Sequence, residues 1–110
     1  MENKIEIICN TLNEKLAEDV IVIDFDHQNA LTDYFIIATA KNFRHGNSLV
    51  DFVEEALKQN GYEIRNTEMS KDSGWFVLDC EDVIVHIFLE EDRAKYQLER
   101  LWADFRITKM

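Results

Sequence analysis

The residues best suited to chemistry are an Asp-x-Asp pair at the end of an apolar run. Asp24 and Asp26 would share one face of a strand, because side chains at i and i+2 point to the same side. Two carboxylates placed in this way could hold Mg²⁺ for phosphoryl transfer or hydrolysis. The alternative is that they are strand-end acids in a chain with 22 acidic residues. The sequence contains neither a P-loop nor a dinucleotide-binding glycine motif, which favours the alternative.

Histidine and cysteine are the other candidates for catalytic or metal chemistry. His27, His45 and His86 are not spaced as zinc ligands with one another or with a cysteine, so we predict no metal site. Cys80 and His86 fall on opposite faces of a predicted hairpin, which argues against a nucleophile–base pair. Asp79 and His86 fall on the same face, where a hydrogen bond would either tune a general base or satisfy two structural polar groups.

Two groups of basic residues lie on predicted helices. Arg93, Lys95 and Arg100 alternate with acidic residues, which is typical of a solvated helix face with ion pairs at i, i+4. Arg44-His45 begins another predicted helix, where it would either bind an anion or a partner or stay solvated in the first turn.

Most of these candidates are positioned by residues 74–102, GWFVLDCEDVIVHIFLEEDRAKYQLERLW. Two β-branched and aromatic runs flank Glu81-Asp82 and predict a β-hairpin with a two-residue turn. In that register one face is wholly apolar and belongs to the core: Phe76, Leu78, Cys80, Val83, Val85 and Ile87. The other face is mixed and must either pack under a helix or meet a partner: Trp75, Val77, Asp79, Ile84, His86 and Phe88.

Hydrophobic periodicity predicts the remaining elements. Apolar residues at helical spacing predict helices at about 4–18, 43–60 and 91–105, and Asn42 and Gly61 are suited to cap the second. The apolar stripe of the third helix comprises Ala94, Leu98, Leu101, Trp102 and Phe105. Short apolar runs predict strands at 20–25 and 33–40, and a weaker alternating pattern predicts a strand at 62–68 near a sheet edge. Residues 69–73 are predicted to be a loop and residues 106–110 a loose tail.

The predicted order of elements is α-β-β-α-β-β-β-α. Helices interleaved with buried-type strands indicate an α/β or α+β fold, with helices packed on a mixed five-stranded sheet. The strands at 33–40 and 62–68, joined by a helix, could form a right-handed parallel crossover. We expect a single domain over residues 1–110, with its core at about 3–105.

Composition limits the possible partners. The formal charge of -10 repels phosphate backbones, so broad nucleic-acid binding is not expected, and no direct sequence-specific contact with nucleic acid is predicted. A basic protein surface fits this charge better, although the acidity alone also keeps a domain soluble. Cys9 and Cys80 fall on core positions, which predicts buried free thiols in a reducing compartment. No apolar run reaches membrane-spanning length, so we expect a cytoplasmic protein.

One ordered pattern runs through the C-terminal half. From residue 74 it reads G-W-x-x-x-D-x-x-D-V-x-V-H, and from residue 91 E-x-R-x-x-Y-x-L-E-x-L-W. Thr32-Asp33-Tyr34-Phe35 and Arg44-His45 extend it upstream. Over roughly residues 20–102 the chain thus resembles the ribosomal silencing factor (RsfS, Iojap-related) family. One departure is Thr-Ala-Lys-Asn-Phe at 39–43, where relatives usually have a turn with Ser and Gly.

The resemblance implies a translation factor that is not an enzyme and has no cofactor. Family members bind the large ribosomal subunit through large-subunit ribosomal protein fourteen and sterically block joining of the small subunit. This represses translation under nutrient limitation, and relatives are also linked to ribosome biogenesis. The implied fold is a nucleotidyltransferase-like core without catalytic motifs. The residue pattern leaves an alternative function, a metal-dependent nucleotidyltransferase or phosphohydrolase. Asp24 and Asp26 would be its metal ligands, with Asp79 as a candidate third ligand.

The partner-binding surface is expected to combine the mixed hairpin face with the outer side of the last helix. Large aromatic side chains with a few polar groups are typical of interface hot spots. Trp102 is expected in the core instead, and a homodimer through the same face is a further possibility. The predicted contact residues are Trp75, Asp79, His86, Arg93, Lys95, Tyr96, Glu99 and Arg100.

Overall fold

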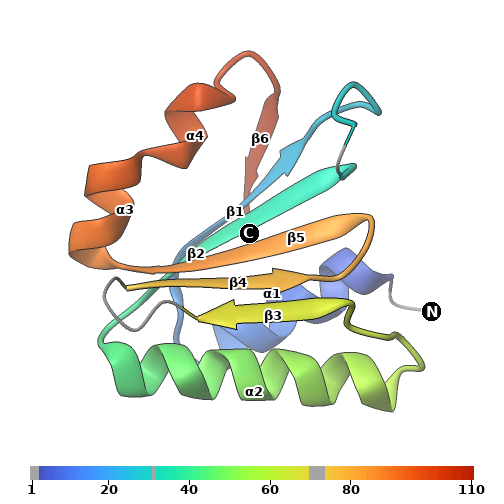
Figure 1. The fold of residues 1–110 in the computed structure, drawn as a ribbon, viewed down its shortest axis with the longest axis vertical. Helices are drawn as coiled ribbons and strands as arrows, with labels where there is room; N and C mark the ends of the chain where they lie inside the picture. Colours follow the sequence, from blue (N-terminus) through green and yellow to red (C-terminus); the bar gives the residue numbers. More distant parts are fainter. Residues whose placement is uncertain (1–2, 31, 70–73) are drawn as a thin grey trace.

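The structure is a computed structural model that describes residues 3–30, 32–69 and 74–110 (Figure 1). The strands are β1 (Glu18–Asp24), β2 (Tyr34–Ala40), β3 (Asn66–Met69), β4 (Trp75–Asp79), β5 (Val83–Leu89) and β6 (Arg106–Lys109). The helices are α1 (Lys4–Glu14), α2 (Phe43–Gln59), α3 (Glu90–Tyr96) and α4 (Leu98–Leu101). The strands form one mixed sheet in the order β3-β4-β5-β2-β1-β6. This confirms the predicted fold class, with one strand more than expected.

The predicted hairpin register is confirmed. β4 and β5 are antiparallel, with Leu78 opposite Val85 and Phe76 opposite Ile87. The Cys80 amide donates to the Val83 carbonyl at 2.8 Å, which closes the turn at 81–82. A one-residue slip would exchange the two faces of a strand, so this register decides which side chains enter the core.

One face of the sheet, the first face, is covered by α1 and α2 and carries the larger core (Figure 1). Helix α2 is capped as predicted: the Asn42 side chain accepts from the His45 amide, and Gly61 after its C-terminal end has φ +81°. Helix α1 is shorter than predicted and ends at Glu14, and Leu16 is exposed with φ 68°. The hairpin side chains predicted as core all lie in this cluster: Phe76, Leu78, Cys80, Val83, Val85 and Ile87.

A second, smaller core lies on the opposite face of the sheet, the second face. Its buried members are Ile21, Ile23, Phe25, Ile37 and Phe88. The segment after β5 supplies the cover, because Leu98, Trp102 and Phe105 pack against this cluster. The Trp102 ring lies 5.0 Å from Phe25 and the Phe105 ring 5.2 Å from it. The prediction that Trp102 packs in the core is therefore confirmed.

The prediction of a single helix at 91–105 is wrong, because the structure has two short helices there. Gln97 adopts a left-handed conformation, with φ 48° and ψ 48°, and separates α3 from α4. The break lets the chain bend, so that Leu98 and Trp102 reach the second face. Leu101, predicted on the buried stripe, is instead 71% exposed.

The tail predicted to be loose forms strand β6. It pairs antiparallel with β1, with Ile107 opposite Ile23 and Thr108 opposite Val22. This pairing satisfies backbone groups of β1 that would otherwise form an open sheet edge. Part of the loop predicted at 69–73 lies outside the described residues.

Strand β3 lies at the other edge of the sheet, as expected for the weak strand predicted there. It starts at Asn66 rather than at Tyr62, whose partly buried side chain packs against the first-face core. The pairing directions make β3 parallel to β2, so the predicted parallel crossover exists, but β5 and β4 lie between the two strands. Within the described residues no helix has the length and hydropathy to cross a membrane.

Candidate functional site

The acidic residues considered for metal chemistry are not gathered into one site. The Asp24 Oδ1 atom accepts from the Asp26 amide at 2.8 Å, so part of this carboxylate is used in a local turn. Asp79 on β4 lies three strands away from β1, the strand that carries Asp24. Across the sheet, Asp79 is opposite Ile84 on β5, and the row continues through Phe35 on β2 to Ile23 on β1. That separation is about 14 Å. Among the described residues no group of three or more His, Cys, Asp or Glu could hold a metal ion.

The two cysteines are buried free thiols, as predicted. Burial raises the pKa of Cys9 to about 12 and that of Cys80 to about 11, so both thiols stay protonated at neutral pH. Cys80 belongs to the first-face core, whereas His86 contacts the aromatic rings on the second face. A Cys80–His86 nucleophile pair is therefore not formed.

Trp75 anchors the most distinctive cluster of the predicted site residues. Its indole Nε1 donates to His86 Nδ1 at 3.0 Å across the β4–β5 pair. Its ring lies 4.7 Å from the Tyr96 ring on α3 and 5.0 Å from the Phe88 ring. Strands β4 and β5 and helix α3 thus bring Trp75, His86 and Tyr96 together.

The structure places His86 below the surface, which corrects its predicted place on an exposed face. It is 6% exposed, and burial lowers its pKa to about 4, so the ring is neutral at pH 7. The predicted Asp79–His86 pair is not formed: His86 Nδ1 accepts from Trp75, and Asp79 Oδ1 accepts from the Glu81 amide at 3.0 Å. His86 is therefore positioned to act on its neighbour Trp75 rather than to touch a partner.

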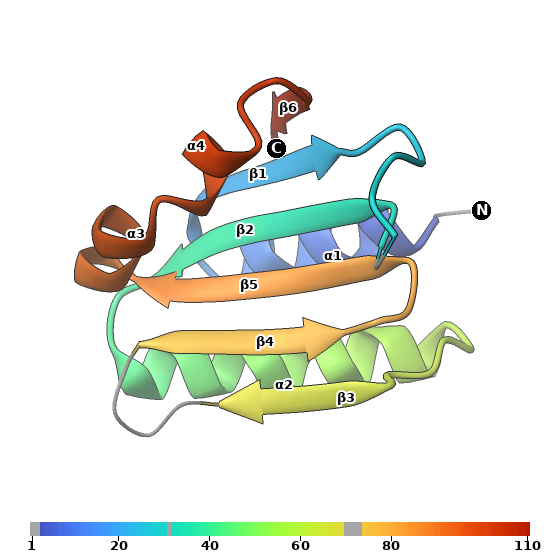
Figure 2. The same cartoon turned by 45° about the horizontal axis from the view of Figure 1, so that its top comes forward.

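The second face is buried from β1 to β5 in its central row and becomes more open on β4. In one row of paired residues Ile21, Ile37 and His86 are buried, whereas Val77 on β4 is half-buried. The uncovered area reaches from β5 across β4, and Figure 2 shows it free of helices among the described residues. We call it the aromatic face, and its members are Trp75, Val77, Ile84 and Tyr96.

Acidic residues flank the aromatic face. Asp79 is half-buried beside Ile84, and Glu68 on β3 is exposed opposite Val77. Lys95 is exposed, and its Nζ lies 5.6 Å from the Tyr96 ring centroid. The surface thus combines large apolar side chains with a rim of charge.

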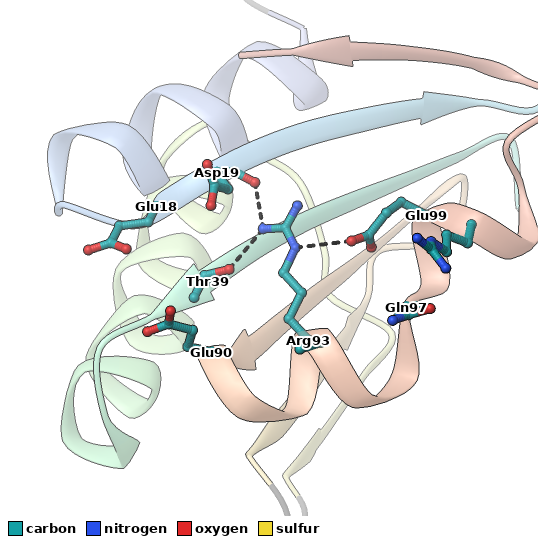
Figure 3. Close-up of a pocket in the computed structure, with 9 residues that line it drawn as sticks. Glu18, Asp19, Thr39, Glu90, Arg93, Gln97 and Glu99 are labelled. Carbon is teal, nitrogen blue, oxygen red and sulfur yellow. Dashed lines mark hydrogen bonds and ion pairs between the residues drawn. The ribbon is translucent and has the colours of Figure 1, made fainter.

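Arg93 belongs to a second cluster and is turned inward (Figure 3). Its Nη1 donates to the Asp19 carbonyl at 2.7 Å and to Thr39 Oγ1 at 2.8 Å, and its side chain is 13% exposed. Asp19 lies where the β1–β2 register shifts, with φ 48°, so its carbonyl is available to the guanidinium. The predicted solvated position of Arg93 is therefore wrong, because the side chain ties α3 to β1 and β2.

Glu99 completes this cluster from α4. Its Oε1 lies 3.6 Å from Arg93 Nε, and its buried Oε2 has no hydrogen-bond partner among the described residues. A hollow of about 330 Å³ surrounds the pair and is lined by groups of both charges, with Arg100 exposed at its rim. No local pattern in the sequence indicates the Arg93 partners, except that Thr39 is a polar residue in an otherwise apolar run.

Arg44-His45 is divided between surface and structure. Arg44 is exposed, but both ring nitrogens of His45 are used internally. Its Nδ1 accepts from the Lys41 amide at 3.0 Å, and its Nε2 donates to the Lys15 carbonyl at 2.8 Å. His45 therefore links the start of α2 to the end of α1.

Comparisons with known proteins give a consistent result. The model of the family "Ribosomal silencing factor during starvation" matches residues 1–109. A Haemophilus influenzae protein named Ribosomal silencing factor RsfS is 31% identical over 99 residues, which cover 90% of this chain and 97% of that protein. The Bacillus subtilis protein of the same name is 27% identical over 100 residues, covering 91% of this chain and 85% of the relative.

Two further matches extend the comparison. A mouse protein named Mitochondrial assembly of ribosomal large subunit protein 1 is 28% identical over 103 residues. The match covers 89% of this chain and 44% of the mouse protein. A crystal structure of a Chromobacterium violaceum protein superposes with a TM-score of 0.87 at 28% identity, covering 94% of this chain and 88% of that one.

Proposed function

The chain belongs to the ribosomal silencing factor family, and from this premise we propose that it binds the large ribosomal subunit and represses translation when nutrients are scarce. Its contact on the subunit is large-subunit ribosomal protein fourteen. Bound there, it occupies space that the small subunit needs for joining. The action is steric and requires no catalysis and no cofactor. The name of the mouse relative supports an association with the large subunit and its assembly.

The observation that carries this proposal is the aromatic face with its acidic flank. Trp75 and Tyr96 offer large rigid rings that remain partly exposed, and such residues dominate interface energetics. The surrounding Asp79 and Glu68, together with a net charge of -10, complement a basic ribosomal protein. Complementary charge speeds encounter and disfavours wrong partners.

The predicted contact residues divide into direct and supporting roles. Trp75 and Tyr96 are the apolar anchors, and Asp79, Lys95 and Arg100 contribute polar contacts at the rim. The inward-facing residues His86, Arg93 and Glu99 act through the positions of their neighbours. A homodimer through the same face would compete with ribosome binding, because both would bury Trp75 and Tyr96.

Co-sedimentation with isolated large subunits tests the proposal. The purified protein should pellet with large subunits, and at saturating concentration it should reduce association with small subunits. Unchanged subunit association at saturation would overturn the proposed mechanism. Tyr96→Ala should weaken binding about tenfold or more, because truncating a hot-spot aromatic costs about 2 kcal/mol.

Phe52→Ala is the matched control for Tyr96→Ala. Phe52 is 38% exposed and Tyr96 36%, but Phe52 lies on α2, on the opposite side of the sheet. The two variants lose similar exposed aromatic surface, so only a specific interface separates them. Equal binding by both would remove Tyr96 from the contact surface.

A further inference from the structure

His86 is a buried polar residue in an apolar and aromatic setting. Its side chain lies among the rings of Phe35, Phe88 and Trp75, with ring centroids 4.4, 6.3 and 5.8 Å away. Val77 and Ile37 are its neighbours on the adjacent strands. Burying an imidazole in such surroundings costs free energy unless both nitrogens are paired.

Only one His86 nitrogen has a hydrogen-bond partner among the described residues. Nδ1 accepts from the Trp75 indole, so in the neutral ring the proton resides on Nε2. The Nε2 atom is buried and has no partner within the described residues. Within the described part of the chain, the imidazole therefore has a single polar interaction, the one with Trp75.

The Trp75 side chain is restrained by a hydrogen bond and by ring packing. An indole has two side-chain torsions, and here its N–H is held by His86 while its ring packs against Phe88 and Tyr96. The ring is nevertheless half-buried, with an outer edge that is open to a partner. A side chain fixed before binding loses less conformational entropy when the complex forms.

We propose that His86 is a positioning residue that fixes the Trp75 indole in its partner-binding orientation, and that the fold would be no less stable without it. This inference rests on the proposed function, because it assigns Trp75 to the ribosome-binding surface. A buried histidine can have either of two roles. A structural histidine satisfies both nitrogens and strengthens the fold, whereas a positioning histidine serves one neighbour.

His45 provides the internal contrast. Both of its ring nitrogens are paired, one with the Lys41 amide and one with the Lys15 carbonyl, and it joins two helices. Its hydrogen bonds involve backbone groups far from the aromatic face. Removal of His45 should therefore lower stability without a specific effect on binding.

The experiment compares His86→Leu, His86→Asn and His45→Leu in three measurements. Thermal and urea unfolding report stability, co-sedimentation with isolated large subunits reports affinity, and NMR reports the indole N–H of Trp75. Trp102 supplies an internal reference resonance. Leucine removes the acceptor and leaves an apolar side chain, whereas asparagine retains an acceptor oxygen on a shorter side chain.

We expect His86→Leu to keep or raise the unfolding temperature while binding weakens about tenfold. The Trp75 indole resonance should shift and its hydrogen exchange should accelerate, with the Trp102 signal unchanged. His86→Asn should recover part of the affinity. In a Trp75→Phe background, His86→Leu should cause no further loss, because the ring of phenylalanine has no N–H to hold.

Two results would overturn the inference. One is a His86→Leu variant whose unfolding temperature falls as far as that of His45→Leu, which marks a structural residue. The other is a released indole with unchanged affinity. Absence of wild-type binding to large subunits would instead remove the proposed function, while the stability and NMR measurements would still decide whether His86 holds Trp75.

Discussion

The two faces of the sheet are built from the same strands and differ in almost every physical respect. The first face is covered by α1 and α2 and carries the larger apolar cluster. The second face is only partly covered, and it holds Thr39 and His86, two of the three polar residues that are buried within the described parts of the chain. Alternation along β4 and β5 thus assigns neighbouring residues to different tasks. Most of the apolar core lies on the first face, and the surface that we propose for recognition lies on the second.

The difference follows from the directionality of the forces involved. Apolar burial is non-directional, so the first face needs only volume and close packing. On the second face His86 and Arg93 each make hydrogen bonds that require particular partners at particular distances. Such contacts orient side chains more sharply than packing alone, which would suit the partner-binding surface that we propose there.

The largest expected effect separates adjacent residues of β4. Phe76 is 2% exposed on the first face, and Phe76→Ala should lower the free energy of unfolding by about 3–5 kcal/mol. Val77 is half-buried on the second face, and Val77→Ala should lower the free energy of unfolding by about 1 kcal/mol or less. Urea denaturation measures both values. Equal losses would contradict the division of tasks between the faces.

The next effect depends on pH and concerns His86. Its folded-state pKa of about 4 is below the ordinary 6.5, so protonation favours the unfolded chain. Stability is then fully present above about pH 6.5 and is lost as pH falls toward 4, by about 3 kcal/mol in total. Urea unfolding at pH 7 and pH 4.5 should show this loss in the wild type, after subtraction of the change in His86→Leu. Identical pH dependence of the two proteins would refute it.

A smaller effect is expected from the Arg93 cluster. Arg93→Met removes the donors to Asp19 and Thr39 and leaves Glu99 without its ion-pair partner, which should cost about 2 kcal/mol. Amide exchange should accelerate in α3 more than in α2. Arg100→Met is the control, because Arg100 is exposed and should change stability by less than about 0.5 kcal/mol.

The sequence predicted the first face well because its signals are local. The two-residue turn at 81–82 and the parity of apolar residues were enough to set the β4–β5 register. The Asn42 cap and Gly61 likewise mark the ends of α2 through short-range chemistry. These features depend on residues that are close in the chain, so they can be read without coordinates.

The second face was predicted less well because distant residues decide it. Gln97 has good helix propensity, yet it is left-handed where the chain bends to place Trp102 and Phe105 on Phe25. Strand β6 exists through its pairing with β1, more than eighty residues earlier in the chain. The polarity of His86 suggests an exposed position, but its burial depends on which part of the second face the rest of the fold covers.

Strand β6 also has a consequence for the timing of folding during synthesis. Every strand and helix that builds the first face precedes residue 90, so all of these elements emerge from the ribosome before residues 98–109. The cover of the second face and the edge partner of β1 come from residues 98–109 and leave the ribosome afterwards. Until then Phe25 and the outer edge of β1 lack their cover, and exposed edges of this kind are prone to wrong pairing. The elements of the first face are therefore all available for packing before the second face can be completed.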